Sequence, residues 1–338
     1  MRREWTQDDA CAPTWVPEAN PDAGAHPGGH AFIPPVPHNN APQMVAARYR
    51  VLRRLGSGGC GDVHLAIDTA LQGRQVALKR LPLHMQADPR CTARLAHEAK
   101  MAVRVRHPHI VTVYDYDVDA SGAPFVVMEY VRGETLASLA HRRLALVEVA
   151  AIGRQLCQAL TALHDEGIVH RDVKPSNIMV RRHQGRLTVK LVDFGLAKRI
   201  EPDAEAAAQT QEVVCGTPQY MAPEQIIGGP VDGRTDLFGL ACVLYELLTG
   251  TPPGGRAARQ LILTRQMYST PPPLHAQGVQ VPDALDRALR AALQKEPNQR
   301  PDSLHDLEHA LAQILMGPIS FLENKENLRD HYLGDEHE

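Results

Sequence analysis

The stretch Val169–Val180, "VHRDVKPSNIMV", concentrates polar groups of several kinds in a short segment. Within it stand His170, Arg171, Asp172, Lys174 and Asn177. Short β-branched runs flank these residues, which indicates a loop between ordered elements. A solvated turn would also be polar, but it would not require two basic groups, a carboxylate and an amide together. Whether this loop carries chemistry depends on the rest of the chain.

The composition indicates a folded protein with a large core. The chain has 338 residues, of which 43% are hydrophobic and 22% charged, enough for one large domain or two lobes. The formal net charge of -3 provides no basic field, so we expect no nucleic-acid partner. The opening "MRREWTQDDA" has no apolar run, so we expect no secretory signal. The longest apolar segment, "DLFGLACVLYELLTG", is interrupted by Glu246 and predicts a buried helix rather than a membrane span.

The cysteines stand singly and form no CxxC pair. They are Cys11, Cys60, Cys91, Cys157, Cys215 and Cys242. In a chain of this length they are most simply reduced thiols, which predicts a cytoplasmic location.

Pattern changes along the chain predict three regions. Residues 1–47 are rich in Pro and Gly and lack periodicity, which predicts a disordered tail. A partner-binding segment is the alternative, because both tryptophans, Trp5 and Trp15, lie there. Residues 48–316 form the folded domain, and the charged residues 317–338 form a C-terminal tail.

The folded region is expected to be α+β and bilobal. Alternating runs predict strands in "YRVLRRL", "DVHLAID" and "RQVALKRL", and two more in "HIVTVYDYDVD" and "PFVVMEYV", joined at Ser121-Gly122. The spacing of "CTARLAHEAKMAVRV" predicts a helix. A long amphipathic helix ends at Gly167, and further helices are expected over about 232–249, 257–267, 282–294 and 302–315. A small β-rich N-lobe, 48–131, is thus followed by a larger α-helical C-lobe, 132–316.

The stretch "LGSGGCGDV" contains Gly56, Gly58 and Gly61 in the pattern GxGxxG. Dinucleotide-binding folds use the same letters, but there the last glycine opens a helix. Here "DVHLAID" alternates with period two, which predicts a strand. The loop therefore joins two antiparallel strands, where glycines let backbone N–H groups approach phosphates. A plain glycine hairpin is the structural alternative.

The next strand, "VALK", places Lys79 among apolar residues, which a solvated charge does not explain. A lysine in this position needs a carboxylate, and Glu98 on the following helix is the natural partner. Such a pair contributes little stability, since desolvation offsets attraction. We interpret it as a device that aims the ammonium at phosphate oxygens.

With "HRDVKPSN", "DFG" (Asp193, Phe194, Gly195) and "APE" (Ala222, Pro223, Glu224), these motifs occur in the order found in eukaryotic-like Ser/Thr protein kinases. The chain resembles the bacterial branch of that family over roughly residues 48–316. The resemblance implies a kinase that uses ATP and Mg²⁺ and phosphorylates Ser or Thr in proteins, including itself. "DVKPSN" and Thr217 in "GTPQY" resemble Ser/Thr rather than tyrosine kinases.

The resemblance implies a role for each polar group. Asp172 would accept the proton of the attacking hydroxyl, and Lys174 would neutralise the γ-phosphate. Lys79, held by Glu98, would position the α- and β-phosphates. Asn177 and Asp193 would bind Mg²⁺.

The nucleotide site implied by the resemblance is formed mainly by the N-lobe. Backbone groups from Glu129 to Val131 would pair with adenine, and Met128 would stand at the back pocket. Glu134 would bind ribose or remain a solvated carboxylate. The other residues assigned to the nucleotide are Leu55, Gly56, Ser57, Gly58, Gly59, Cys60, Gly61, Val63, Ala77 and Met179.

Four further residues are interpreted as structural. Glu224 and Arg300 resemble the family's buried ion pair, and Asp236 would brace the catalytic loop. His170 would pack beside Phe194.

The activation segment departs from the common pattern. Between Phe194 and Gly216 it has one hydroxyl acceptor, Thr210, and its hydrophobic Val213 and Val214 follow Glu212. Thr210 is a switch, or Glu212 supplies a constant negative charge, or activation needs no phosphate. Cys60 and Cys215 lie near the proposed site, where they are redox sensors or ordinary small side chains.

Two other function classes compete with this interpretation. A catalytically silent scaffold usually lacks the lysine, the base or the metal aspartate, and all three are present here. Kinases of small molecules usually lack the "GTPQY…APE" segment and the Arg300 anchor.

Overall fold

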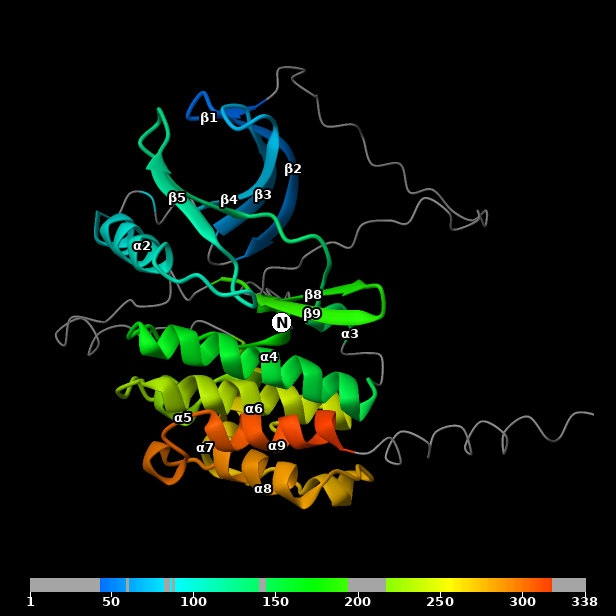
Figure 1. Ribbon diagram of the computed structural model, residues 1–338. Coiled ribbons are helices and arrows are strands. Elements are labelled where there is room, and N and C mark those ends of the chain that lie inside the picture. Colours follow the sequence, from blue (N-terminus) through cyan, green and yellow to red (C-terminus); the bar gives the residue numbers. More distant parts are fainter. Residues whose placement is uncertain are drawn as a thin grey trace, which may run out of the picture. The chain divides into compact units, whose positions relative to one another are not determined.

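The computed structural model describes residues 43–58, 61–81, 86, 89–139, 144–193 and 217–317. They fall into two compact units, coloured by sequence in Figure 1. The first unit comprises the described residues through Leu139, Pro175–Arg181 and Lys190–Thr217, and the second comprises Ala140–Lys174, Arg182–Val189 and the chain from Pro218. This division differs from the boundary expected after residue 131, because the first unit continues through Leu139 and two later segments return to it.

The first unit is built on a six-stranded antiparallel sheet in the order β1-β2-β3-β4-β6-β5. The strands are β1 (Met44–Val45), β2 (Tyr49–Gly58), β3 (Gly61–Asp68), β4 (Arg74–Arg80), β5 (Val113–Val118) and β6 (Pro124–Glu129). Alternation in the sequence produces the buried face, as in β3, where Val63 and Leu65 are buried. Tyr49 and Phe125 meet edge to face in the core, with ring centroids 5.8 Å apart.

The ordered sheet begins before residue 48, the start expected from the sequence. Met44 and Val45 pair with Arg50 and Tyr49, and Val45 is buried in the sheet's core. Two residues are too short for an alternation signal, which is why this strand was not expected.

Helix α2 (Pro89–Ala102) contacts β5 within the first unit. Leu95, Ala99 and Ala102 are buried, as their helical spacing predicts, whereas Val103 follows the helix and is 40% exposed. The rest of the unit comes from later in the chain. It includes two short helical segments, α3 (Leu136–Leu139) and the 3₁₀ turn η1 (Pro175–Asn177). It also includes β7 (Glu134–Thr135) and parts of β8 (Ile178–His183) and β9 (Arg186–Leu191). These three strands form a second sheet in the order β7-β8-β9.

The second unit is helical. Its α-helices are α4 (Leu146–Asp165), α5 (Pro223–Ile226), α6 (Gly233–Thr249), α7 (Arg259–Tyr268), α8 (Asp283–Ala292) and α9 (His305–Met316). Single 3₁₀ turns are η2 (Pro218–Tyr220), η3 (Leu274–Gln277) and η4 (Pro297–Gln299). The expected helices are confirmed with end shifts of a few residues, and so is the α+β class.

Helices α4, α6 and α9 pack closely, and they lie side by side in Figure 1. A Cβ on Gly153 of α4 would stand 2.8 Å from a Leu311 methyl of α9 and 3.0 Å from a Leu244 methyl of α6, so a larger residue would force these side chains to shift. Helix α6 begins at the cap Asp232, which accepts from the Arg234 amide, and ends at Gly250 with φ of 80°. Among the described helices, only α4 is long and apolar enough to cross a membrane, and half of that window is buried inside the protein, as in a core helix.

Candidate active site

The glycine loop joins two antiparallel strands, as the alternation after Gly61 predicts. Gly56 pairs with Val63, Ser57 with Asp62 and Gly58 with Gly61. Gly61 has φ of 119°, and a Cβ there would collide with the carbonyl oxygen of Arg80, so no other residue fits without a shift. No helix opens at this glycine, which excludes the dinucleotide-binding alternative. Gly59 and Cys60 lie outside the described residues.

The apolar residues expected around adenine are all buried in the first unit. Ala77 of β4 pairs with Met128 of β6, and Val63 pairs with Lys79 across β3 and β4. The buried set is Leu55, Val63, Ala77, Met128 and Met179. Burial alone also fits a core, so their contact with a nucleotide stays a prediction.

Lys79 is 5% exposed, and its Nζ lies 2.7 Å from Oδ1 of Asp193. The sequence pointed to Glu98 as its partner; Glu98 lies in α2, but its side chain is outside the described part of the structure. The pair brings together two groups that stand 114 residues apart in the chain. Asp193 has φ of 56°, in the left-handed region that few non-glycine residues adopt.

Asn177 and Asp193 lie on segments joined by a backbone hydrogen bond. The Val192 amide donates to the Asn177 carbonyl at 2.9 Å, and the Asn177 side chain is buried. An amide oxygen and a carboxylate are hard ligands, so this donor set fits Mg²⁺. No cluster of three or more His, Cys, Asp or Glu side chains that could hold a metal exists among the described residues.

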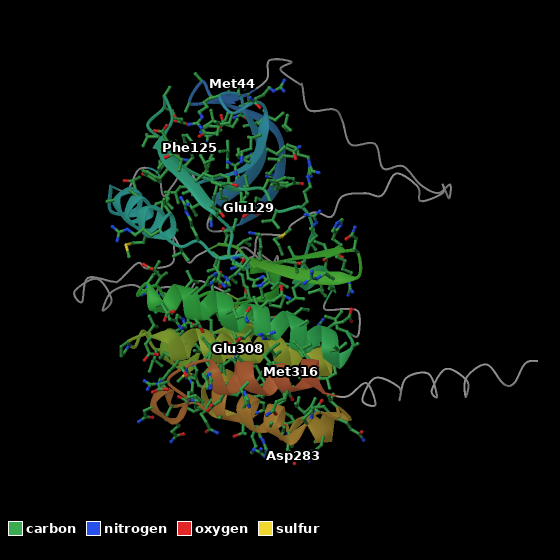
Figure 2. All side chains as sticks on the ribbon, in the orientation of Figure 1. Met44, Phe125, Glu129, Asp283, Glu308 and Met316 are labelled. Atoms are coloured by element: carbon green, nitrogen blue, oxygen red, sulfur yellow. The ribbon has the colours of Figure 1, made fainter. Side chains whose placement is uncertain are left out.

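The segment Glu129–Val131, called the hinge below, begins at the last residue of β6. The Glu129 amide donates to the Thr112 carbonyl at 2.8 Å, and its carboxylate lies 2.8 Å from Lys190 Nζ. Figure 2 labels Glu129 at the end of β6. No local pattern indicates the pair with Lys190, because the two residues are 61 positions apart and neither lies in the other's motif.

Glu134 follows the hinge, where the sequence fits either ribose binding or a solvated carboxylate. The Ser138 hydroxyl lies 3.1 Å from Oε2 of Glu134 and 2.6 Å from the Thr135 carbonyl oxygen, so the carboxylate stands beside its own turn. The preceding Gly133 has φ of 156°, and a Cβ there would collide with the Val180 carbonyl oxygen. The glycine therefore lets β7 approach β8 closely.

The second unit holds the proposed base. Asp172 Oδ2 lies 3.0 Å from Nζ of Lys174, and Lys174 is 2% exposed. The Asp172 amide approaches Nδ1 of the fully buried His170 at 3.3 Å. His170 is thus a core residue, as expected, but its expected neighbour Phe194 lies outside the described residues.

Asp236 braces the loop that carries Asp172, which confirms the prediction made for it. Its Oδ2 accepts from the His170 amide at 2.8 Å and its Oδ1 from the Arg171 amide at 2.7 Å. Nε2 of His164 lies 2.8 Å from the same carboxylate. His164 was missed; the signal was a polar side chain in the last turn of an otherwise apolar helix face. Gln225 was missed too, and its Nε2 donates to the Arg171 carbonyl at 2.8 Å.

Glu224 and Arg300 form the predicted buried ion pair. Both guanidinium nitrogens, Nη1 and Nη2, lie 2.8 Å from the two carboxylate oxygens, and the Thr235 hydroxyl donates at 2.7 Å. Burial alone would raise the pKa of Glu224, but the hydrogen bonds from Arg300 and Thr235 outweigh it and lower that pKa below its ordinary value. Arg300 also donates to the carbonyls of Gln294, Arg234 and Lys295, so the charge is fully shared.

Several predictions fall outside the described residues. These are the activation-segment residues Thr210, Glu212, Val213, Val214 and Cys215, and the tails 1–42 and 318–338. Thr217 is described and partly buried.

Comparison with known proteins gives consistent matches. Residues 49–312 match the protein kinase domain family. The chain is 37% identical over 281 residues to the serine/threonine-protein kinase PknB of Mycolicibacterium smegmatis, covering 82% of this chain and 44% of that protein. It is 36% identical over 311 residues to the serine/threonine-protein kinase Pkn1 of Myxococcus xanthus, covering 91% of this chain and 44% of that protein. The chain thus spans less than half the length of these relatives.

A solved structure agrees with the sequence matches. The crystal structure of the Mycobacterium tuberculosis PknI kinase domain matches with a TM-score of 0.62 and 32% identity, covering 81% of this chain and 98% of that chain.

Proposed function

Since the chain belongs to the protein kinase family, and within it to the bacterial serine/threonine protein kinases, we propose that it transfers the γ-phosphate of ATP to serine and threonine hydroxyls of proteins. The observation that carries this proposal is that each unit holds its reactive groups in a defined ion pair. Lys79 pairs with Asp193 in the first unit, and Asp172 with Lys174 in the second.

In the proposed reaction Asp172 accepts the proton of the attacking hydroxyl. The hydroxyl oxygen forms the new bond to the γ-phosphorus while the bond to the ADP oxygen breaks. Lys174 neutralises charge on the group in transfer, and Lys79 orients the α- and β-phosphates. Such positioning, more than covalent chemistry, lowers the barrier in phosphoryl transfer.

Asn177 and Asp193 are the residues that would hold Mg²⁺. When bound there, Mg²⁺ would supply the positive charge that neutralises the phosphates. The protein contributes the backbone bond between Val192 and Asn177, which links the two ligand segments, and the Lys79 ammonium, which orients the Asp193 carboxylate.

The alternative of a catalytically silent scaffold has no observation in its favour. Lys79, Asp172 and Asp193 are all present, and each has a charged neighbour at 2.7 to 3.0 Å. A kinase for small molecules is disfavoured because Arg300 anchors Glu224 of the "APE" motif.

Incubation with ATP and Mg²⁺, followed by phosphosite mapping on the protein, tests the proposed activity. Asp172→Asn should reduce incorporation by roughly two or more decades, because it removes the base and the hydroxyl orienter. Asp165→Asn, at an exposed position at the end of α4, is the matched control and should behave as wild type. Wild-type incorporation in Asp172→Asn would remove Asp172 from its role.

The same mapping addresses the acceptor within the chain. We propose Thr210 as the self-phosphorylated residue, because it is the one hydroxyl residue between Phe194 and Gly216. Thr210→Val should then abolish a phosphopeptide and lower turnover. Unchanged turnover would favour Glu212 as a constant charge or activation without phosphate.

We also propose that this domain works in the cytoplasm. Cys157 and Cys242 are buried free thiols, consistent with a reducing compartment. Burial raises the pKa of the Cys242 thiol to about 12, so it is inert near neutral pH. Fractionation of cells with an antibody to the domain tests the location.

A further inference from the structure

Lys190 lies in β9, three residues before Asp193, and its side chain reaches the hinge. Its Nζ lies 2.8 Å from the Glu129 carboxylate and donates to the Ile110 carbonyl at 3.2 Å. The two charged side chains are 21% and 26% exposed, so the pair is better shielded from water than an ordinary surface ion pair.

Both the backbone and the side chain of Glu129 form hydrogen bonds with Thr112. Its amide donates to the Thr112 carbonyl at 2.8 Å, and its Oε2 accepts from the Thr112 amide at 3.3 Å. The segment before Thr112 is in turn bonded to β9: the Val111 amide donates to the Leu191 carbonyl at 2.9 Å. Lys190 therefore closes a ring of contacts that joins the hinge to β9.

The same stretch of chain continues to the residues proposed for metal and phosphate. The Val192 amide donates to the Asn177 carbonyl, and Asp193 pairs with Lys79 at 2.7 Å. Four consecutive residues, 190–193, thus connect the proposed adenine end of the site with its phosphate end. All of these contacts lie within the first unit.

We propose that Lys190 is a positioning residue for the nucleotide. By holding the Glu129 carboxylate, it fixes the hinge backbone relative to Asp193. One ATP molecule can then bind the hinge through its adenine and the Asp193 region through its phosphates at the same time. Lys190 does not touch the nucleotide; it acts through Glu129. The proposal rests on the proposed function, because it assumes that adenine binds at the hinge. Contacts between adenine and the hinge are the same in bound ATP and in the transition state, so weakening them raises KM and leaves kcat nearly unchanged.

The first experiment measures kcat and KM for ATP in four proteins: wild type, Lys190→Met, Lys190→Arg and Arg182→Met. Methionine keeps the stem of Lys190 without its charge. Lys190→Met should raise KM about three- to fivefold, with kcat within about twofold. Lys190→Arg should restore KM. Arg182→Met is the matched control, since Arg182 pairs with Glu148 at 2.6 Å within the second unit, and its KM should not change.

The second experiment measures adenosine binding by calorimetry. Adenosine has no phosphates, so its affinity reports on the hinge alone. Lys190→Met should weaken it by the same factor as KM, whereas Lys79→Met should leave it unchanged. A Glu129→Gln, Lys190→Met double variant should be no weaker than Lys190→Met, because both changes break one interaction.

The outcomes separate this inference from the proposed function. Unchanged KM and unchanged adenosine affinity in Lys190→Met would overturn the positioning role while leaving the kinase activity intact. A lower melting temperature and lower kcat at unchanged KM would mean that Lys190 only stabilises the fold. A wild-type protein that neither binds adenosine nor transfers phosphate would overturn the proposed function itself.

Discussion

Asp236 holds Arg171 in a left-handed backbone conformation, through the 2.7 Å hydrogen bond that its Oδ1 accepts from the Arg171 amide. Arg171 has φ of 65°, which costs a non-glycine residue about 1 kcal/mol or more. Asp172, the proposed base, is the next residue, so the orientation of its side chain depends on the strained backbone of Arg171. The buried carboxylate in α6 offsets the strain and fixes the loop.

Asp236→Asn should therefore damage catalysis more than nucleotide binding. The amide has one acceptor oxygen, so it can keep only one of the bonds to His170 and Arg171, and its NH₂ group faces an N–H donor. We expect kcat to fall roughly 10- to 100-fold, because small displacements of a reacting group are costly. KM for ATP should stay within about twofold. A variant with wild-type kcat would show that the loop holds its conformation without Asp236.

Lys79→Met should slow phosphoryl transfer roughly 100-fold or more while adenosine still binds. The ammonium orients phosphates and Asp193, whereas the hinge and the apolar walls hold the base. Steady-state turnover at saturating ATP, paired with adenosine calorimetry, checks this. Turnover equal to wild type would remove Lys79 from the site.

Glu224→Gln should destabilise the protein in a manner that depends on pH. The variant leaves the buried Arg300 charge without its carboxylate, which costs roughly 3–5 kcal/mol for a buried pair. The folded-state pKa of Glu224 is lowered, so its stabilising effect is complete above the unfolded value, near 4.5, and is lost as pH falls through the folded pKa. The difference in unfolding free energy between wild type and variant should be largest at neutral pH and should shrink below about pH 4.

Denaturant titrations at several pH values measure that difference. Glu296→Gln, at an exposed position before η4, serves as the control and should show almost no difference at any pH. A gap for Glu224→Gln that stays constant down to acidic pH would mean that the carboxylate charge is not the source of the stabilisation.

Two truncations should separate the tail from the fold. Removal of residues 1–42 should leave the melting temperature and turnover on a generic basic substrate nearly unchanged. Removal of residues 1–46 also deletes β1 and the buried Val45, whose burial is worth about 1.5–3 kcal/mol. The longer truncation should therefore melt at a lower temperature. A large loss from the shorter one would place part of the tail in the fold.

The sequence predicted the elements and the local motifs well, because both have local signals. Alternation marked β3, and helical spacing marked α4, since each pattern follows from the geometry of a single element. The pair of Glu224 and Arg300 was expected only through the family resemblance, since the residues stand 76 positions apart.

The contacts that the sequence does not predict join segments that lie far apart in the chain. The contact of His164 with Asp236 spans 72 positions, and that of Lys190 with Glu129 spans 61. His164 stood out only as a polar side chain on an apolar helix face, which does not identify its partner, and no local pattern distinguishes Lys190 from a solvated lysine. The early start of the sheet at Met44 was missed for the opposite reason: β1 is too short to show a period.

The interleaved chain path of the first unit has a consequence during synthesis on the ribosome. Lys79 and Asp193 are 114 residues apart, so at bacterial rates of about 5–20 residues per second their pair cannot form until roughly 6–23 s after Lys79 is made. When Asp193 is synthesised, all described residues of the first unit's sheets and of the hinge have already been synthesised, whereas Asp236 is synthesised later still. A nascent chain therefore acquires the groups proposed to bind nucleotide before it acquires the carboxylate that fixes its catalytic loop.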